Sequence, residues 1–203
     1  MTSIRLAADI GGTFTDIALE AHGELHTAKV LTTPLEPAVA VIDGIERVLL
    51  DAALSPQDVD VFVHGTTLAT NALIERRGAR TALLTTAGMR DSVEIAHENR
   101  FEQYDLAMVR PEPLVPRDLR IGIPERLASN GSILKDLDGE AVARAVKQLK
   151  ASDVESIAIG FLHSYTNSDH EARAAEIIET HWPEVSLSLS SEVCPEIREY
   201  ERF

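Results

Sequence analysis

Apolar and polar residues recur along the chain with two periodicities, that of strands and that of helices, and together they predict an α/β fold. The stretch Ile4–Leu31 contains three apolar runs joined by two tight turns, which predicts an antiparallel β-meander. Apolar residues at helical spacing predict a helix over Pro37–Ala53, and proline suits its first turn. The alternation in Val59–His64 predicts another strand, and a helix that ends at Gly78 follows it. The first part of the chain is therefore expected to be a meander followed by a β/α unit.

The next strand is predicted at Thr81–Thr85, and a short helix follows it. A long segment without a regular pattern comes after that helix. Residues 98–136 are charged and rich in proline, without sustained periodicity. Long loops of this kind in compact domains are usually functional or disordered. Within the segment, Arg120–Leu127 and Ser132–Leu134 flank an Asn-Gly dipeptide, which favours a β-hairpin.

The last third of the chain predicts further alternation of helices and strands. Asp138 can cap a helix, and Ile157–Leu162 and Val185–Leu189 are predicted strands. Ser168 and Glu171 form a capping-box pattern for the helix between those strands. Three regions are therefore expected. They are a first domain at 1–97, an irregular connection with a possible β-hairpin at 98–136, and an α/β segment at 137–203 that ends in a truncated element.

Composition narrows the classes of partner. The 203 residues carry a net charge of −14, and nucleic acid or an anionic membrane would be repelled by it. No apolar run approaches the roughly 20 residues that span a bilayer, and no targeting segment is expected before the first strand. The single cysteine, Cys194, fits a reducing compartment. The sequence predicts a cytoplasmic protein, with neither nucleic acid nor membrane as its partner.

A glycine-rich turn between the first two predicted strands has the composition of a phosphate-binding loop. Its glycines let backbone N–H groups approach an anion, and its threonines add hydroxyl donors. Its aspartates would repel phosphate but can hold the Mg²⁺ that accompanies it. A plain β-turn would need the glycines but neither the carboxylates nor the threonines. The phosphate-binding candidates are Gly11, Gly12, Thr13 and Thr15, and the carboxylate candidates, with a catalytic role, are Asp9 and Asp16.

A second informative stretch lies where the strand ending at His64 gives way to a helix. In open α/β sheets, ligands bind at the carboxyl ends of strands, and a helix start presents free N–H groups to an anion. A well-capped amphipathic helix is the alternative, but capping explains only one of the two adjacent threonines. The substrate-binding candidates here are His64, Gly65, Thr66, Thr67 and Asn71, and in the long connection they are Arg100, Tyr104 and Asp105.

These stretches together resemble the amino-terminal region of the hydantoinase/oxoprolinase family, which includes N-methylhydantoinase A, 5-oxoprolinase and ATP-dependent ketone carboxylase subunits. The resemblance spans essentially the whole chain in the family's order. The matching stretches are Asp9–Asp16, His64–Glu75, Tyr104–Leu106, Arg110–Arg117 and Ser190–Arg202.

The resemblance implies an actin-like ATPase lobe of the ribonuclease H-like class. It implies ATP and Mg²⁺ as cofactors, with Asp9 near the metal and Gly11 to Thr13 along the phosphates. The implied reaction is ATP-dependent opening of a cyclic amide through phosphorylation of its carbonyl oxygen. An actin-like ATPase closes two lobes around its nucleotide, and no second phosphate loop occurs between Asp91 and Phe203. A second lobe or a partner hydantoinase-type subunit is therefore expected.

Other functions remain open on the sequence. Glycine-rich loops with threonine also occur in sugar and acyl kinases of the same superfamily, and the family itself contains ketone carboxylase subunits. A non-catalytic domain that binds nucleotide or a partner is the third possibility, because half of the expected ATP cleft is missing.

Overall fold

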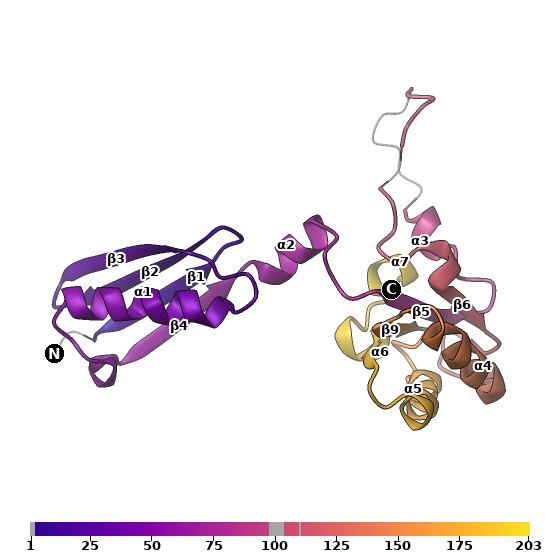
Figure 1. Cartoon of the computed structure of the whole chain (residues 1–203). Coiled ribbons are helices and arrows are strands. Elements are labelled where there is room, and N and C mark those ends of the chain that lie inside the picture. The colour runs from indigo at the N-terminus through magenta and orange to yellow at the C-terminus, as the bar shows by residue number, and fades with distance from the viewer. Residues whose placement is uncertain (1–2, 98–103, 110) are drawn as a thin grey trace. The chain divides into compact units, whose positions relative to one another are not determined.

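In the computed structural model, the chain is a mixed α/β protein that divides into two compact units (Figure 1). The structure describes residues 3–97, 104–109 and 111–203. The first unit ends at Gly78 and the second begins at Ala79. Each unit has its own sheet and its own apolar core.

The sheet of the first unit has four strands in the order β3-β2-β1-β4. Its meander consists of β1 (Arg5–Ile10), β2 (Phe14–Ala21) and β3 (Glu24–Leu31), as the alternation predicted. The fourth strand, β4 (Val61–Thr66), pairs in parallel with β1. Buried and exposed residues alternate along β1 and β2, so one face of the sheet is covered and the other is open.

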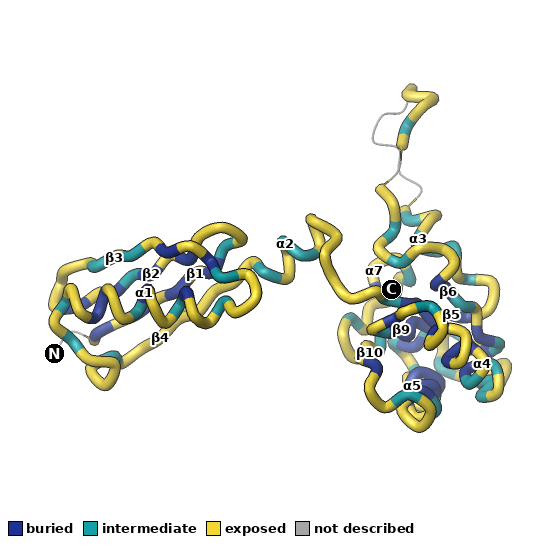
Figure 2. The backbone as a smooth tube through the Cα atoms, viewed as in Figure 1, coloured by how far each residue is buried: buried dark blue, intermediate teal, exposed yellow. Residues whose placement is uncertain are grey.

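One helix, α1 (Pro37–Asp51), covers the buried face, where the strands are dark blue in Figure 2. Helix and sheet approach closely at Gly44, because a Cβ there would lie 2.5 Å from Cγ1 of Ile17. A short 3-10 helix, η1 (Pro56–Asp58), then leads into β4, and α2 (Leu68–Ile74) follows that strand.

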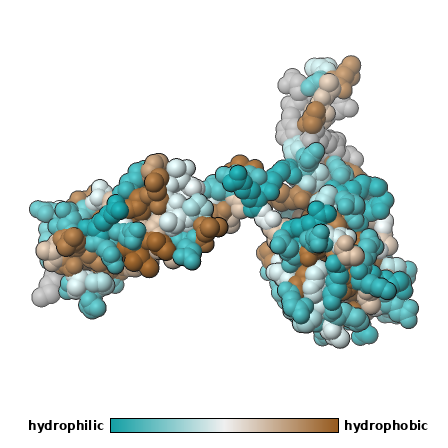
Figure 3. Space-filling view, viewed as in Figure 1, coloured by the Kyte–Doolittle hydropathy of each residue, from teal (hydrophilic) through white to brown (hydrophobic). Residues whose placement is uncertain are grey.

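The strand β4 lies at the edge of this sheet, and all its residues are exposed. Its apolar side chains include Val61, Phe62 and Val63. The face of the first unit seen in Figure 3 carries brown, apolar patches among polar ones. The first unit thus buries one face of its sheet well and leaves apolar surface along one edge.

The sheet of the second unit also has four strands, in the order β10-β9-β5-β6. All its pairings are parallel. The strand β5 (Thr81–Thr86) lies between β9 (Ser156–Gly160) and β6 (Arg120–Ile123) and pairs with both. The outer strand β10 (Ser186–Leu189) pairs with β9. A 3-10 helix, η2 (Arg117–Leu119), leads directly into β6.

Two helices, α4 (Gly139–Lys150) and α5 (Asp169–His181), pack against each other and against one face of this sheet to form its core. Shorter helices complete the unit (Figure 1). They are α3 (Ser92–Ile95), α6 (Ser190–Val193) and α7 (Glu199–Arg202). The strand pair β7 (Arg126–Leu127) and β8 (Ile133–Lys135) is antiparallel and closes across the Asn-Gly turn, as the sequence predicted.

Three expectations differ from the structure. The expected first domain, 1–97, extends past the division at Gly78, because β5 pairs with strands that come much later in the sequence. Only the second half of Arg120–Leu127 joins the hairpin, since its first half is β6 in the parallel sheet. The capping box at Ser168 is wrong: Ser168 makes no capping hydrogen bond, and the Glu171 carboxylate accepts from the N–H of Phe161 at 2.9 Å instead. Among the described residues, no helix has the length and apolar character needed to cross a bilayer.

Candidate functional site

The glycine-rich turn is a tight hairpin between β1 and β2. The Gly11 N–H donates to the carbonyl oxygen of Phe14 at 2.9 Å, and a Cβ on Gly11 would lie 2.9 Å from the same oxygen. The Thr32 hydroxyl donates to the Gly11 carbonyl at 2.9 Å, and the Thr32 N–H donates to the Thr13 carbonyl at 3.0 Å. Thr32, which directly follows β3, therefore holds the turn through two of its carbonyl oxygens.

The second informative stretch meets this turn directly. The Thr67 N–H donates to the Ile10 carbonyl at 3.2 Å, which joins the start of α2 to the end of β1. A Cβ on Gly12 would lie 3.1 Å from Nδ2 of Asn71, and that amide donates to the Thr67 hydroxyl at 3.3 Å. Both stretches predicted from sequence therefore lie at the same end of the same sheet.

A row of residues paired in register crosses the open face beside the turn. Strand register aligns Gly65 of β4, Asp9 of β1, Asp16 of β2 and Lys29 of β3 as successive partners. The Lys29 ammonium lies 3.1 Å from Oδ1 of Asp16. Residues Ala7 and Ala18 form the next pair of partners, and both line the same shallow depression in this face. Small residues beside paired carboxylates leave room for a ligand on the sheet.

The pair of aspartates is electrostatically unfavourable without a cation. Residues directly opposite on antiparallel strands have Cβ atoms about 4.5–5.5 Å apart, and like charges there are destabilising. Lys29 neutralises Asp16, which leaves Asp9 beside Gly65, whose missing side chain keeps that carboxylate accessible. Asp9 is therefore the freer of the two carboxylates.

The donor set suits a magnesium ion that arrives with phosphates. Within the described residues, no group of three or more histidine, cysteine or acidic side chains could hold a metal alone. Magnesium in nucleotide sites uses one or two carboxylates, several waters and the phosphate oxygens. The two glycines beside Asp9 have little room for side chains, and their backbone can approach an anion. The residues present thus fit Mg²⁺ with a nucleotide phosphate.

Several predicted residues lie away from this row. The Thr15 side chain is buried on the helix-covered face, where its hydroxyl is 3.0 Å from that of Thr32. His64 and Thr66 are register partners of Ala8 and Ile10, so they belong to that face too. The His64 ring stacks on Phe62, with ring centroids 6.3 Å apart. The alternation of a strand explains all three placements, since neighbours of Asp16 and Gly65 must point the other way.

The candidates in the long connection belong to the second unit. Tyr104 is 87% exposed, and the Asp105 carboxylate accepts from the N–H of Ala107 at 2.8 Å. Arg100 lies outside the described residues. The glycine-rich turn lies in the first unit, and the role of Tyr104 and Asp105 in binding substrate stays a prediction.

Sequence reasoning missed Lys29 and Thr32. Lys29 sits on the third strand of the meander, and only the register places it opposite Asp16. Counting back from the two turns of the meander would have revealed this pairing. Thr32 follows β3 and bonds the turn through both its hydroxyl and its N–H, a contact between residues far apart in sequence that periodicity does not report.

Comparison with known proteins relates this arrangement to a family. A family model described as the hydantoinase/oxoprolinase N-terminal region matches residues 5–182. Caprolactamase subunit alpha of Pseudomonas jessenii is 37% identical over 205 residues, which cover 98% of this chain and 30% of that protein. The 5-oxoprolinase of Saccharomyces cerevisiae is 32% identical over 241 residues, covering 97% of this chain and 18% of that protein.

Two solved structures share the fold. The crystal structure of ATP-dependent caprolactamase from Pseudomonas jessenii matches with a TM-score of 0.84 at 36% identity, over 98% of this chain and 30% of that chain. A nucleotide-free acetone carboxylase structure, from work on ATP-dependent acetone carboxylation, matches with a TM-score of 0.89 at 25% identity, over 100% of this chain and 31% of that one. The chain spans about three tenths or less of the length of these relatives. It belongs to the hydantoinase/oxoprolinase family and corresponds to the family's N-terminal region.

Proposed function

We propose that this chain is the N-terminal region of an ATP-dependent hydrolase that opens cyclic amides, and that its first unit is an actin-like lobe that binds Mg–ATP. The observation that carries the proposal is the row Gly65–Asp9–Asp16 beside the tight turn at Gly11 and Gly12. Two facing carboxylates and a turn with bare backbone suit a metal-bound phosphate. The names of the caprolactamase and 5-oxoprolinase relatives support a cyclic amide as substrate.

Each residue of the row has a separate role in the proposal. The backbone of Gly11, Gly12 and Thr13 faces the phosphates, and Asp9 holds Mg²⁺ through water. Asp16 is positioned by Lys29, which also lowers the negative charge that an incoming nucleotide meets. Thr15 acts indirectly, since its hydroxyl bonds Thr32 and Thr32 holds the turn.

ATP supplies a phosphoryl group that, once on the carbonyl oxygen of the amide, makes the carbonyl carbon a better electrophile. The chain's contribution is positioning and neutralisation of charge on the transferring phosphoryl group. A role in contacting substrate stays a prediction for the segment from His64 to Thr67 with Asn71 in the first unit, and separately for Tyr104 and Asp105 in the second.

The proposal includes a second lobe or a partner subunit. The relative named caprolactamase subunit alpha supports a partner, and the share of the relatives' length that this chain spans leaves room for a second phosphate loop. A cytoplasmic location stays a prediction from the sequence.

The test follows backbone amide resonances of the chain while Mg–ATP is added. Shifts at Gly11, Gly12 and Thr13 are expected in the wild type, and Asp9→Asn and Gly12→Val should remove them. Glu46→Gln, which neutralises an exposed carboxylate on α1, is the matched control and should keep them. Absence of shifts in the wild type, or their persistence in both variants, would contradict nucleotide binding here.

An ATP-dependent ketone carboxylase is the second candidate, and the fold match to acetone carboxylase favours it. Product analysis of this chain together with the proposed second lobe or partner subunit separates the two. Ring-opened amino acid from a cyclic amide supports the hydrolase, whereas bicarbonate-dependent formation of a keto acid supports the carboxylase. A stable phosphorylated product would indicate a kinase of the same superfamily.

A further inference from the structure

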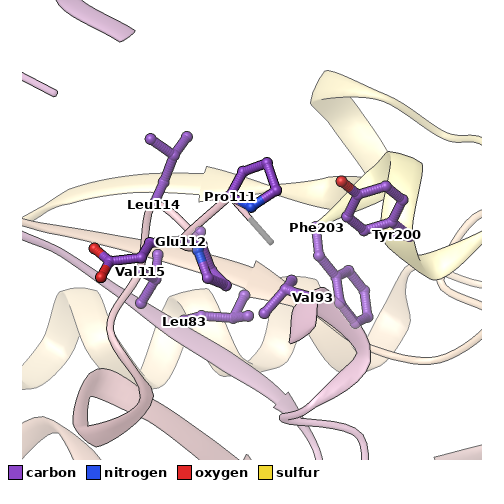
Figure 4. Close-up of a pocket in the computed structure, with 10 residues that line it drawn as sticks. Leu83, Val93, Pro111, Glu112, Leu114, Val115, Tyr200 and Phe203 are labelled. Carbon is purple, nitrogen blue, oxygen red and sulfur yellow. The ribbon is translucent and has the colours of Figure 1, made fainter. Parts of the chain in front are cut away.

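The second unit contains an apolar cavity of about 320 Å³ on the face of its sheet opposite α4 and α5 (Figure 4). Leu83 of β5 and Ala158 of β9, partners in register, form its floor. Leu114 and its proline neighbours line one side, and the rings of Tyr200 and Phe203 line the other. None of these residues belongs to the row Gly65–Asp9–Asp16–Lys29 of the first unit, so the cavity is a separate feature.

The aromatic wall is held in place by a buried arginine. The guanidinium of Arg202 donates to the Ser190 hydroxyl at 3.1 Å, to the Glu196 carbonyl at 2.6 Å and to the Phe161 carbonyl at 2.9 Å. Ser190 in turn donates to the buried carboxylate of Glu171 at 2.6 Å. These bonds hold the segment that carries Tyr200 and Phe203, whose rings line the cavity.

Two sequence features form the two sides of the cavity. The Phe203 ring occupies the place that a Cβ on Gly160 would take, so glycine at that position admits the ring. The opposite side is built from a proline-rich segment, and proline restricts the backbone before any ligand binds. A cavity whose walls are already fixed loses little conformational entropy when it is filled.

We propose that this cavity binds the ring of a small, uncharged cyclic amide. Its volume lies at the lower end of the range for small-molecule sites, which suits a single ring. Its lining is mostly carbon, and Glu112 is the one charged lining side chain among the described residues. A carboxylate on the ligand would be buried without a cationic side chain in the described lining, which is unfavourable, so a neutral lactam is preferred to an anionic one such as 5-oxoproline. The inference rests on the proposed function for the identity of the ligand.

The test uses caprolactam as the probe and the methyl resonances of the whole 203-residue chain as the readout. Saturable shifts of the methyl groups of Leu83, Leu114 and Val115 are expected, with an affinity in the millimolar range because the ligand is small. Ala158→Leu fills the floor and should weaken binding at least tenfold. Ala172→Leu places the same side chain on the exposed side of α5 and should leave binding unchanged.

A second cavity variant keeps the test valid if Ala158→Leu fails to fold. Leu114 is 63% exposed, so Leu114→Ala should leave the fold intact and weaken binding severalfold. Three results would overturn the proposal: no saturable shift at these methyl groups, full affinity in both cavity variants, or equal affinity for 5-oxoproline. Mg–ATP binding is measured on the same samples. A chain that binds Mg–ATP but not caprolactam refutes the cavity assignment alone, and the opposite result refutes the nucleotide site alone.

Discussion

Replacement of Asp9 by asparagine should stabilise the first unit and weaken its binding of Mg–ATP. Asp9 faces Asp16 across the antiparallel pair, where Cβ atoms lie about 5 Å apart, and we take this spacing as the scale for the distance between the two charges. In water, two such charges repel by about 0.8 kcal/mol, and salt at 0.1 M reduces this to about 0.5 kcal/mol. The value for water applies because the Asp16 side chain is 53% exposed. For a unit of this size, 0.5 kcal/mol corresponds to a rise of about 2–4 °C in Tm.

Neutralising the other carboxylate should have a different effect. Asp16→Asn removes the same repulsion but also removes the ion pair with Lys29, and an exposed pair of this kind contributes about 0.2–1 kcal/mol. The two changes offset each other, so the Tm of Asp16→Asn should stay near that of the wild type. The asymmetry between the two variants is specific to the row Gly65–Asp9–Asp16–Lys29.

Thermal unfolding followed by circular dichroism, with and without Mg–ATP, measures both effects. Without ligand, the gain in Asp9→Asn should disappear at 1 M salt, where the Debye length falls to about 3 Å. With Mg–ATP at about 100 times its Kd, the wild type should gain about 2.7 kcal/mol and the variant far less. Destabilisation by Asp9→Asn without ligand, or equal stabilisation of both proteins by Mg–ATP, would refute the reasoning.

Three further predictions concern packing and charge. Gly44→Ala should destabilise the first unit by about 1–3 kcal/mol in urea unfolding, because the added methyl meets Ile17 at the helix–sheet contact; a gain in stability, as alanine gives in an exposed helix, would contradict this. Glu171→Gln should destabilise the second unit by about 3 kcal/mol, since this buried carboxylate accepts three hydrogen bonds and an amide has one oxygen; unfolding near the wild-type urea midpoint would contradict it. The Arg117 guanidinium lowers the pKa of Asp91, so their interaction stabilises the fold above the ordinary aspartate range and is lost as pH falls through the lowered pKa. Melts of Arg117→Gln and of the wild type should therefore begin to approach each other below about pH 4 and coincide only below the lowered pKa of Asp91, and a constant difference would contradict the linkage.

The elements were predictable from sequence where a local pattern determines them. Alternation in the first 31 residues gives three strands whose buried positions match the covered face of the sheet. Asp138 caps α4 as expected, because its carboxylate accepts from the Ala141 N–H at 2.9 Å. The Asn-Gly turn likewise closes β7 onto β8. In each case the partners lie within a few residues or one hairpin.

The pairings that depend on distant residues could not be read from the pattern. The strand β5 was assigned to the first domain because it follows α2, yet its partners are β6 and β9. Glu171 has the spacing of a capping residue, but a buried carboxylate with three donors is more strongly bound than a helix cap.

The candidate site divides in the same way. The turn and its aspartates were found from composition, and the structure places them together with the start of α2. Composition does not reveal on which face of the sheet each side chain lies. It therefore predicts Thr15 at the phosphate, whereas the Thr15 side chain is buried against Thr32. Lys29 needed the register of the third strand.

The different strand connections of the two units have a consequence for folding kinetics. The meander of the first unit forms from neighbouring segments, as in the contact of Thr15 with Thr32, which are 17 positions apart. The second unit must bring together segments such as those of Arg80 and Glu155, which are 75 positions apart. Closure of longer loops and parallel pairing both slow folding. Refolding from denaturant should therefore show two phases, and during synthesis the glycine-rich turn should form before the second unit does.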